Sequence, residues 1–281
     1  MMVLAPLRGV TIRCFRETFA AEIAEAGFTE AFTPFVSAMA GLDPLADREL
    51  KGERPSFAAA KLRLTPQFIG KDPVALRHCL ERVKSAGFDT ADLNCGCPFR
   101  MVTSKGRGSG LLRSPDVLER MLAVGCETMG AGKFSVKARL GLERPDELLS
   151  LMPVINRYPL RFLTVHARTA RQMYSGECDL AALEAVESAA KVPVLRNGDL
   201  DWRLGSGMVG RSFVRDLGAR ADAGELLVRY IRASVAELSG DRPVLGRMKE
   251  LLAYWSVLPR WRRLWPVIKL TRSVDELLAL C

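Results

Sequence analysis

Short apolar segments alternate with amphipathic stretches over the first 210 residues of the chain. The apolar segments predict eight β-strands, at residues 3–6, 31–36, 64–70, 91–94, 134–139, 161–167, 193–197 and 207–209. The stretches between them predict helices at residues 12–26, 73–86, 115–129, 145–156 and 180–188. Two of these helices begin with an N-cap residue followed by Pro, at Asp72-Pro73 and Ser114-Pro115. Strands alternating with helices predict an α/β fold, a (β/α)8 TIM-type barrel.

Two stretches depart from this pattern. Residues 41–62 are polar and contain two Pro, which predicts a long loop with a short helix. Only residues 199–209 separate Gly198 from Gly210, whereas a helix, its loops and a strand need roughly 20 residues. We therefore expect the helix after the seventh strand to be missing or reduced to a turn. Its loss should expose apolar strand surface and leave the following loop less well anchored.

The strand pattern stops near residue 212. Apolar residues recur at helical spacing over residues 222–239 and 244–256, and residues 274–280 predict a last short helix. We expect a barrel domain over residues 1–212 and a small helical domain over residues 213–281.

The composition limits the class of protein. The chain has 281 residues, a net charge of +9, seven scattered Cys and two His. An odd number of dispersed Cys predicts reduced thiols in a cytoplasmic protein, and the spacing of Cys95 and Cys97 matches no common zinc site. We expect the protein to be a monomer. There is no secretory signal pattern and no apolar run near the roughly 18 residues of a membrane span, so we expect neither membrane nor metal. The positive charge favours a polyanionic partner; the alternative is a merely basic protein from an Arg-rich proteome.

A thiol stands out at the end of the fourth predicted strand. Asp92-Leu93-Asn94-Cys95-Gly96-Cys97-Pro98 runs from an apolar segment into a loop rich in Gly and Arg. An isolated Cys is most often a small buried hydrophobic residue. Here the flanking Gly96 and Pro98, the nearby Asn94 and the basic loop favour a functional thiol at Cys97.

Polar residues also end other predicted strands. A single strand-end Lys or His is usually a solvated or structural residue, but repetition at the same strand end predicts a polar ring at the C-terminal face of the barrel. Gly198, Gly210 and Arg211 could hold a phosphate after the last two strands. The strand-end groups that could contact a flavin are Gln67, Asn94, Lys137 and His166.

These motifs resemble the tRNA-dihydrouridine synthases. The resemblance runs in order from residue 3 to residue 211, through Ala5-Pro6-x-x-Gly9-Val10, Asp92-x-Asn94-x-Gly96-Cys97-Pro98, Val136-Lys137-x-Arg139-x-Gly141, Val165-His166-x-Arg168-Thr169, Asn197-Gly198-Asp199 and Gly210-Arg211. The form Asn94-Cys95-Gly96-Cys97-Pro98 and the segment 247–255 are most similar to the bacterial branch that acts on uridine 16 of tRNA. The chain departs from the family at Leu7-Arg8, at Ala167 and in the shortened segment after Asp199, which puts tight flavin binding in question.

The resemblance implies an FMN enzyme with NADPH as reductant. A hydride would pass from flavin N5 to C6 of a flipped-out uridine, and Cys97 would protonate C5 as general acid. The residues that the resemblance and the strand ends together assign to the cofactor are Ala5, Pro6, Gln67, Asn94, Lys137, His166, Asn197, Gly198, Asp199, Gly210 and Arg211.

The cations fit a tRNA partner. We assign to it Arg100, Lys105, Arg107, Arg139, Arg168, Arg247, Lys249, Arg260, Arg262, Arg263 and Arg272. Four aromatic residues, Tyr254, Trp255, Trp261 and Trp265, lie among the last of these and could stack on bases, or they could pack the core of the helical domain while the charges form its solvated face. Two other functions stay open: an FMN barrel oxidoreductase acting on a small pyrimidine, and a non-catalytic tRNA-binding relative that has lost flavin.

Overall fold

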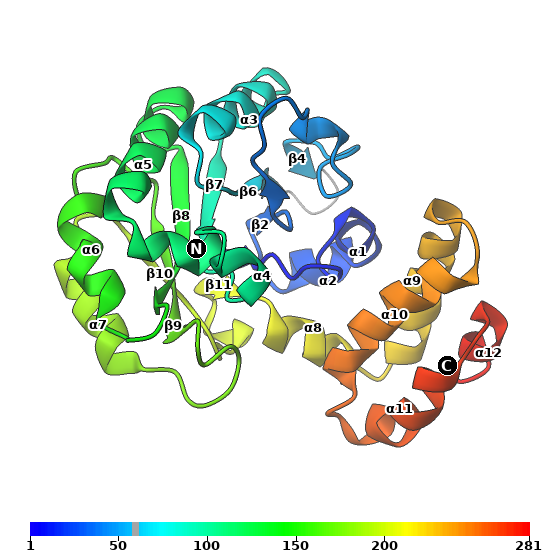
Figure 1. The fold of residues 1–281 in the computed structure, drawn as a ribbon. Helices are drawn as coiled ribbons and strands as arrows, with labels where there is room; N and C mark the ends of the chain where they lie inside the picture. Colours follow the sequence, from blue (N-terminus) through cyan, green and yellow to red (C-terminus); the bar gives the residue numbers. More distant parts are fainter. Residues whose placement is uncertain (58–61) are drawn as a thin grey trace.

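The computed structural model, which describes residues 1–57 and 62–281, contains the predicted TIM-type barrel (Figure 1). The barrel is built from β1 (Met2–Leu4), β2 (Glu30–Phe32), β3 (Val36–Ser37), β5 (Leu62–Thr65), β6 (Gln67–Ile69), β7 (Ala91–Cys95), β8 (Phe134–Gly141), β9 (Leu163–Thr169), β10 (Val194–Asn197) and β11 (Gly207–Val209). These strands pair in parallel, in the order β3-β6-β7-β8-β9-β10-β11-β1-β2-β5. Pro34 interrupts the segment of β2 and β3, and Pro66 interrupts that of β5 and β6, because Pro cannot donate to the strand ladder. The two pairs therefore act as two strands, and the ring has eight.

Helices cover the outside of the barrel. They are α1 (Arg13–Thr18), α2 (Ala20–Glu25), α3 (Pro73–Ser85), α5 (Pro115–Met129), α6 (Glu147–Ile155), α7 (Leu180–Ala189) and α8 (Arg211–Leu217). The helix predicted at residues 12–26 is divided into two at Phe19, whose backbone is not helical. The side chain of Asp72 caps α3 by accepting from the Val74 N–H, whereas Ser114 begins α5 without a side-chain cap bond. The predicted alternation of strands and helices is thus confirmed over most of the barrel.

The two departures from the repeat are found where the sequence places them. The stretch after β3 contains a 3-10 turn, η1 (Pro44–Ala46), and a short strand, β4 (Ser56–Phe57), antiparallel to β5. The remainder of the predicted loop, residues 58–61, lies outside the described residues. After β10 a 3-10 turn, η4 (Trp202–Leu204), stands in place of a helix, so the shortened connection is confirmed.

The short connection leaves β10 partly exposed along its whole length, whereas β9 is fully buried. The connection nevertheless contacts α8 at two points. Trp202 Nε1 donates to Asp216 Oδ2 at 3.2 Å, and its ring packs edge-on against Phe213 of α8. Ser212 Oγ donates to the carbonyl oxygen of Leu200 at 2.7 Å. These contacts join the connection to α8; whether it is less well anchored than in a complete barrel stays a prediction.

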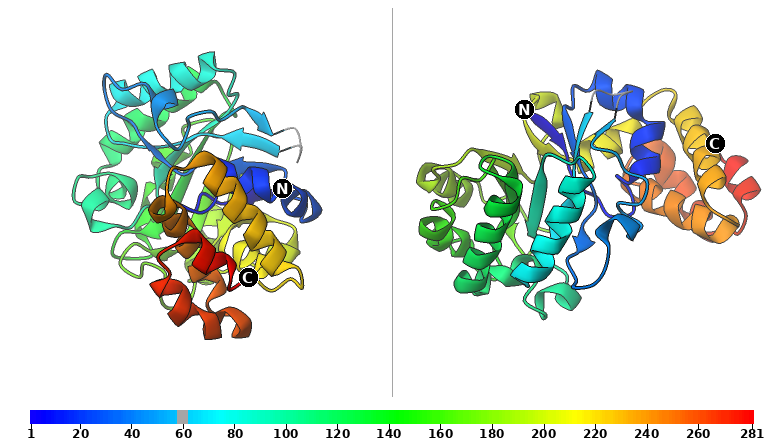
Figure 2. Two further views of the ribbon diagram at one scale, coloured as in Figure 1. Left: turned by 90° about the vertical axis from the view of Figure 1, so that its right-hand side faces the viewer. Right: turned by 90° about the horizontal axis from the view of Figure 1, so that it is seen from above.

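The C-terminal part of the chain packs on one side of the barrel as α9 (Ala223–Glu237), α10 (Asp241–Trp255), α11 (Pro259–Leu270) and α12 (Val274–Leu278) (Figure 2). The sequence analysis did not predict α11, which contains Pro266 and many cations. Helix α8 spans the expected boundary near residue 212 and contacts α10, so the division into two domains stays a prediction. Within the described residues, no helix is both long and apolar enough to cross a membrane.

Two tryptophans join these helices to α8. Trp255 and Trp261 are buried, and their rings are 4.9 Å apart. Their indole N–H groups donate to the carbonyl oxygens of Val214 and Gly218 at 2.7 and 2.8 Å. Of the two readings of the aromatic residues, core packing is therefore correct for these two.

Candidate active site

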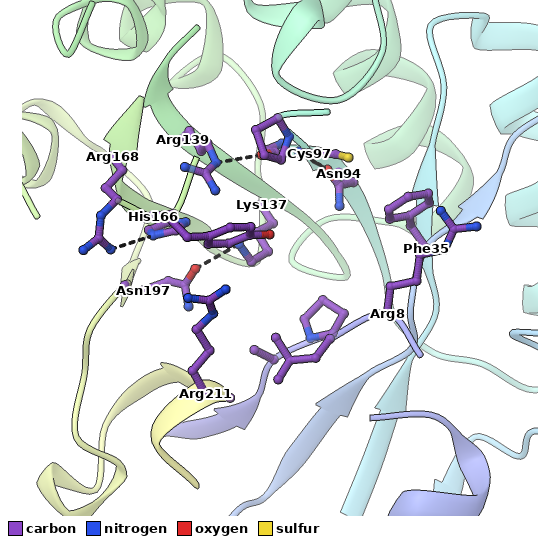
Figure 3. Close-up of a pocket in the computed structure, with 18 of the residues that line it drawn as sticks. Arg8, Phe35, Asn94, Cys97, Lys137, Arg139, His166, Arg168, Asn197 and Arg211 are labelled. Carbon is purple, nitrogen blue, oxygen red and sulfur yellow. Dashed lines mark hydrogen bonds between the residues drawn. The ribbon is translucent and has the colours of Figure 1, made fainter. Parts of the chain in front are cut away.

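A cavity of about 260 Å³ lies at the C-terminal ends of the barrel strands (Figure 3). Of the residues assigned to a cofactor, all but Gln67 line it: Ala5, Pro6, Asn94, Lys137, His166, Asn197, Gly198, Asp199, Gly210 and Arg211. Cys97 lines it as well, together with Leu7 and Arg8, the pair at which the sequence departs from the family that it resembles. Residues far apart in the sequence meet here because parallel strands end at one face of a barrel.

Gln67 lies within the barrel wall and positions its neighbours. Its Nε2 donates to Asp92 Oδ2 at 2.8 Å, and its Oε1 accepts from Asn94 Nδ2 at 2.8 Å. Asn94 Oδ1 in turn accepts from the backbone N–H groups of Gly96 and Cys97 at 3.1 and 2.8 Å. This chain of hydrogen bonds fixes the shape of the loop that carries the Cys97 thiol.

The Cys97 side chain is buried, yet it lines the cavity, whereas Cys95 is buried inside the sheet. The carbonyl oxygen of Cys97 accepts from Ser109 N and Oγ at 3.1 and 3.0 Å. Close to it, Gly108 has φ +58°, and a Cβ there would lie 2.7 Å from that oxygen, so only Gly fits. Burial raises the pKa of the Cys97 thiol, so the thiol keeps its proton at neutral pH.

Lys137 connects three strands of the barrel. Its Nζ donates to Asn197 Oδ1 at 2.9 Å, and Asn197 Nδ2 donates to the carbonyl oxygen of Met208 at 2.7 Å. Desolvation, and then the nearby charge of Arg139, lower the pKa of Lys137 to about 8. At pH 7 the ammonium group is still mostly charged and faces the cavity with a fixed orientation.

His166 is held as a neutral ring by its surroundings. Burial, followed by the charges of Lys137 and Arg139, lowers its pKa to about 2. His166 Nε2 lies 3.3 Å from Arg168 Nη1, and a guanidinium group can only donate, so Nε2 accepts and Nδ1 carries the hydrogen. Arg168 is itself fixed by Asp199, whose Oδ1 lies 3.1 Å from Nη1, and by the carbonyl oxygen of Gly176.

Arg139 is buried and bonds to main-chain oxygens. Its Nε donates to Gly96 O at 3.0 Å, and its Nη1 donates to Thr169 O and Met173 O at 2.9 and 2.7 Å. These bonds link the loop of Cys97 to the loop after β9. The sequence analysis assigned Arg139 and Arg168 to tRNA; in the structure the hydrogen bonds of both go to groups of the protein, and the tRNA assignment stays a prediction.

The sequence analysis missed Tyr174, which lines the cavity from the loop after β9. The guanidinium carbon of Arg211 lies 4.0 Å from its ring centre, and that of Arg139 lies 5.2 Å away. Tyr254 of α10 lines the cavity too, 5.9 Å from the Arg211 guanidinium. A signal for Tyr174 was present, because it follows the His166-x-Arg168-Thr169 motif within a Gly-containing loop.

The other cations assigned to tRNA fall into two groups. Arg100, Lys105, Arg260, Arg262, Arg263 and Arg272 are exposed, and Arg107 is half-buried. Arg247 and Lys249 instead bond within the C-terminal helices. Arg247 Nη1 donates to Ser234 Oγ at 3.2 Å and to a carboxylate oxygen of Glu237 at 2.6 Å. Lys249 Nζ donates to the carbonyl oxygens of Lys269 and Thr271 at 3.0 and 2.9 Å.

Several solved structures have a similar fold. One is the old yellow enzyme homologue from Zymomonas mobilis, with a TM-score of 0.55, 13% identity, and coverage of 76% of this chain and 85% of that one. Another is a morphinone reductase mutant in complex with tetrahydroNAD, with a TM-score of 0.54, 12% identity, and coverage of 76% and 83%. At such low identities the likeness concerns the fold alone. Within the part of the chain that the structure describes, no group of three His, Cys, Asp or Glu is placed to hold a metal.

The sequence comparisons identify the family. The sequence model described as Dihydrouridine synthase (Dus) matches residues 3–204. The chain is 29% identical over 205 residues to tRNA-dihydrouridine synthase B of Vibrio cholerae, and the match covers 71% of this chain but only 60% of that protein. It is 28% identical over 290 residues to the tRNA-dihydrouridine(16) synthase of Pseudomonas putida, with 90% and 87% coverage. Since the family model spans most of the chain and most of the strands whose ends form the cavity, the chain belongs to the dihydrouridine synthase family.

Proposed function

We propose that this protein reduces uridine to 5,6-dihydrouridine in the D-loop of tRNA, with FMN as cofactor and NADPH as reductant. The observation that carries the proposal is the meeting of a protonated thiol, Cys97, and a fixed cation, Lys137, in one cavity at the C-terminal face of the barrel. Such a pair suits a reaction in which one face of a base receives a hydride and the other a proton.

The cavity residues fit FMN. Lys137 and Arg211 supply positive charge, and the lining carboxylate, Asp199, is neutralised by Arg168. At Gly198 an added Cβ would lie 2.7 Å from Cys178 Sγ, and at Gly210 it would lie 3.0 Å from Ala5 Cβ. The bare backbone at these two positions suits the phosphate of the cofactor after the last two strands. When bound, FMN would supply the hydride.

The remaining roles fall to residues of the chain. The Cys97 thiol, with its pKa raised by burial, holds a proton that it can give to C5 of the uracil. The Lys137 ammonium, fixed by Asn197, can stabilise negative charge on the reduced cofactor. Neutral His166 offers an Nδ1–H donor that keeps its proton over the physiological pH range.

Two further details of the proposal have separate support. The Pseudomonas putida protein named for position 16 covers 90% of this chain, including the C-terminal helices, which favours uridine 16 as the target. Exposed cations on α11 and on the loop after Cys97 favour tRNA over a free pyrimidine, because RNA binding depends on contacts to phosphates.

The proposal is tested by a pair of cysteine variants. We expect purified protein to carry FMN and to form dihydrouridine in unmodified tRNA when NADPH is added. Cys97→Ala should lose at least about a hundredfold in rate, as removal of a general acid usually does, and should still oxidise NADPH. Cys95→Ala is the matched control, because Cys95 is fully buried in the hydrophobic core and does not line the cavity, so its loss should affect stability rather than chemistry.

Three results would count against the proposal. Colourless protein that gains no thermal stability from FMN would exclude a flavoenzyme. Reduction of free uridine in preference to tRNA would indicate a small-molecule oxidoreductase. Equal losses of rate in the two cysteine variants would show that Cys97 is not the acid.

A further inference from the structure

A second groove adjoins the cavity on the side of the Cys97 loop. Its volume is about 620 Å³, within the range of roughly 300–1,000 Å³ that is usual for ligand pockets. Pro98 and Phe99 line both the cavity and the groove, so the two hollows share a wall. The described residues that line the groove all precede residue 174, so the C-terminal helices take no part in it.

The groove carries positive charge. Arg100, Arg113 and Arg171 line it, and all three are exposed. A single carboxylate opposes them: Glu143 lies 3.2 Å from Arg113 and 3.7 Å from Arg171. The apolar lining is supplied by Leu142, Ala170 and Met173. Excess positive charge beside apolar surface suits a ligand that has both a phosphate and a flat ring.

Phe99 is exposed at the shared wall. Its side chain is 48% exposed although Phe is normally buried. The chain places it firmly: its carbonyl oxygen accepts from the N–H groups of Val102 and Thr103, at 2.8 and 3.0 Å, where α4 (Arg100–Thr103) begins. An exposed aromatic ring on a hydrogen-bonded backbone, next to arginines, is typical of a base-stacking platform in proteins that bind single-stranded nucleic acid.

We infer that the groove seats the nucleotide next to the uridine that enters the cavity, with its base against Phe99 and its phosphate near Arg100 and Arg171. The inference rests on the proposed function. A base that is flipped out of an RNA strand leaves its neighbours at the mouth of the pocket, and Phe99 forms that mouth on this side. The arginines favour RNA over a protein partner by charge complementarity.

The test compares three variants of the full chain. Phe99→Ala removes the ring, and Phe99→Tyr keeps a ring of similar stacking power. Val74→Ala is the control: it removes a still more exposed apolar side chain, from α3, and Val74 lines neither the cavity nor the groove. The Kd for unmodified tRNA and the kcat and KM for its reduction are measured for each. We expect Phe99→Ala to raise Kd and KM about tenfold, with the larger effect on KM than on kcat, and Phe99→Tyr to restore both.

Salt dependence tests the charged part of the groove. Arg171→Gln should weaken tRNA binding and reduce the slope of log Kd against log salt concentration by about 0.7–0.9, the loss of one phosphate contact. The inference is overturned if Phe99→Ala behaves like Val74→Ala, or if the slope of Arg171→Gln is that of the wild type. It is also overturned if Phe99→Ala changes only self-association, measured by sedimentation. Absence of dihydrouridine in every sample would refute the proposed function, whereas the Kd comparison would still decide on the groove.

Discussion

Replacement of Arg139 by Met should lower stability and uridine reduction together. The guanidinium group is buried and donates to Gly96 O, Thr169 O and Met173 O. Hydrogen bonds from a charged donor contribute about 1.5–3 kcal/mol each. Part of that sum is offset because the variant no longer buries a cation. We therefore expect a loss of about 2–4 kcal/mol, as for other buried networks that lose one partner, and a fall in melting temperature of about 3–7 °C for a chain of this length.

The assay is a thermal melt with and without FMN, run beside dihydrouridine formation. Arg139→Lys is the control: it keeps the charge, but one compact ammonium group cannot reproduce the fork that joins the two loops, so it should recover only part of the stability. An Arg139 that merely contacts tRNA would give the opposite pattern. In that case Arg139→Met would melt at the wild-type temperature and lose only tRNA turnover, and the positioning role derived from the structure would be refuted.

Two further predictions concern titration, in addition to the cysteine and Phe99 variants described above. The rate of uridine reduction should fall as the pH rises through about 8, where Lys137 loses its charge, and fall again at higher pH, where the Cys97 thiol ionises. Lys137→Arg should remove the first step of the pH–rate profile. A profile that is unchanged in this variant would contradict the role of Lys137. His166 should keep one neutral tautomer, with its proton on Nδ1, from about pH 5.5 to 8. Nitrogen-15 NMR spectra can show the tautomer, because the chain has two His and a His78→Gln variant assigns their signals. Protonation of His166 within that pH range would contradict the assignment.

Local patterns account for the parts of the fold that were predicted correctly. The strand at residues 207–209 and the helix at residues 115–129 were predicted with the bounds that the structure gives them, because Gly or Pro stands at the start of each. The helix at Pro259–Leu270 was missed, because an internal Pro and a run of cations and aromatic residues hide its apolar side. The division of the predicted helix at residues 12–26 was missed as well; it occurs at Phe19, which is fully buried.

The shortened connection shows what a residue count can and cannot determine. The count of residues between Gly198 and Gly210 excluded a helix, and the structure contains only a turn there. The residue count could not show which contacts the connection makes, because those contacts depend on side chains elsewhere in the chain. Trp202 reaches Asp216 and Phe213 on α8, and these contacts join the connection to that helix.

The sequence by itself determined the barrel, the strand ends that carry polar groups, the thiol of Cys97 and the basic character of the chain. Those features depend on the order of residues and on the rule that parallel strands end at one face. Only the tertiary structure decided how each group is used. In the structure, Gln67 bonds to Asp92 instead of lining the cavity, and Arg139 and Arg168 donate to acceptors of the protein. Tyr174 lies beside Arg211. Hydrogen-bond partners and burial arise from residues distant in sequence, which is why no local pattern contains them.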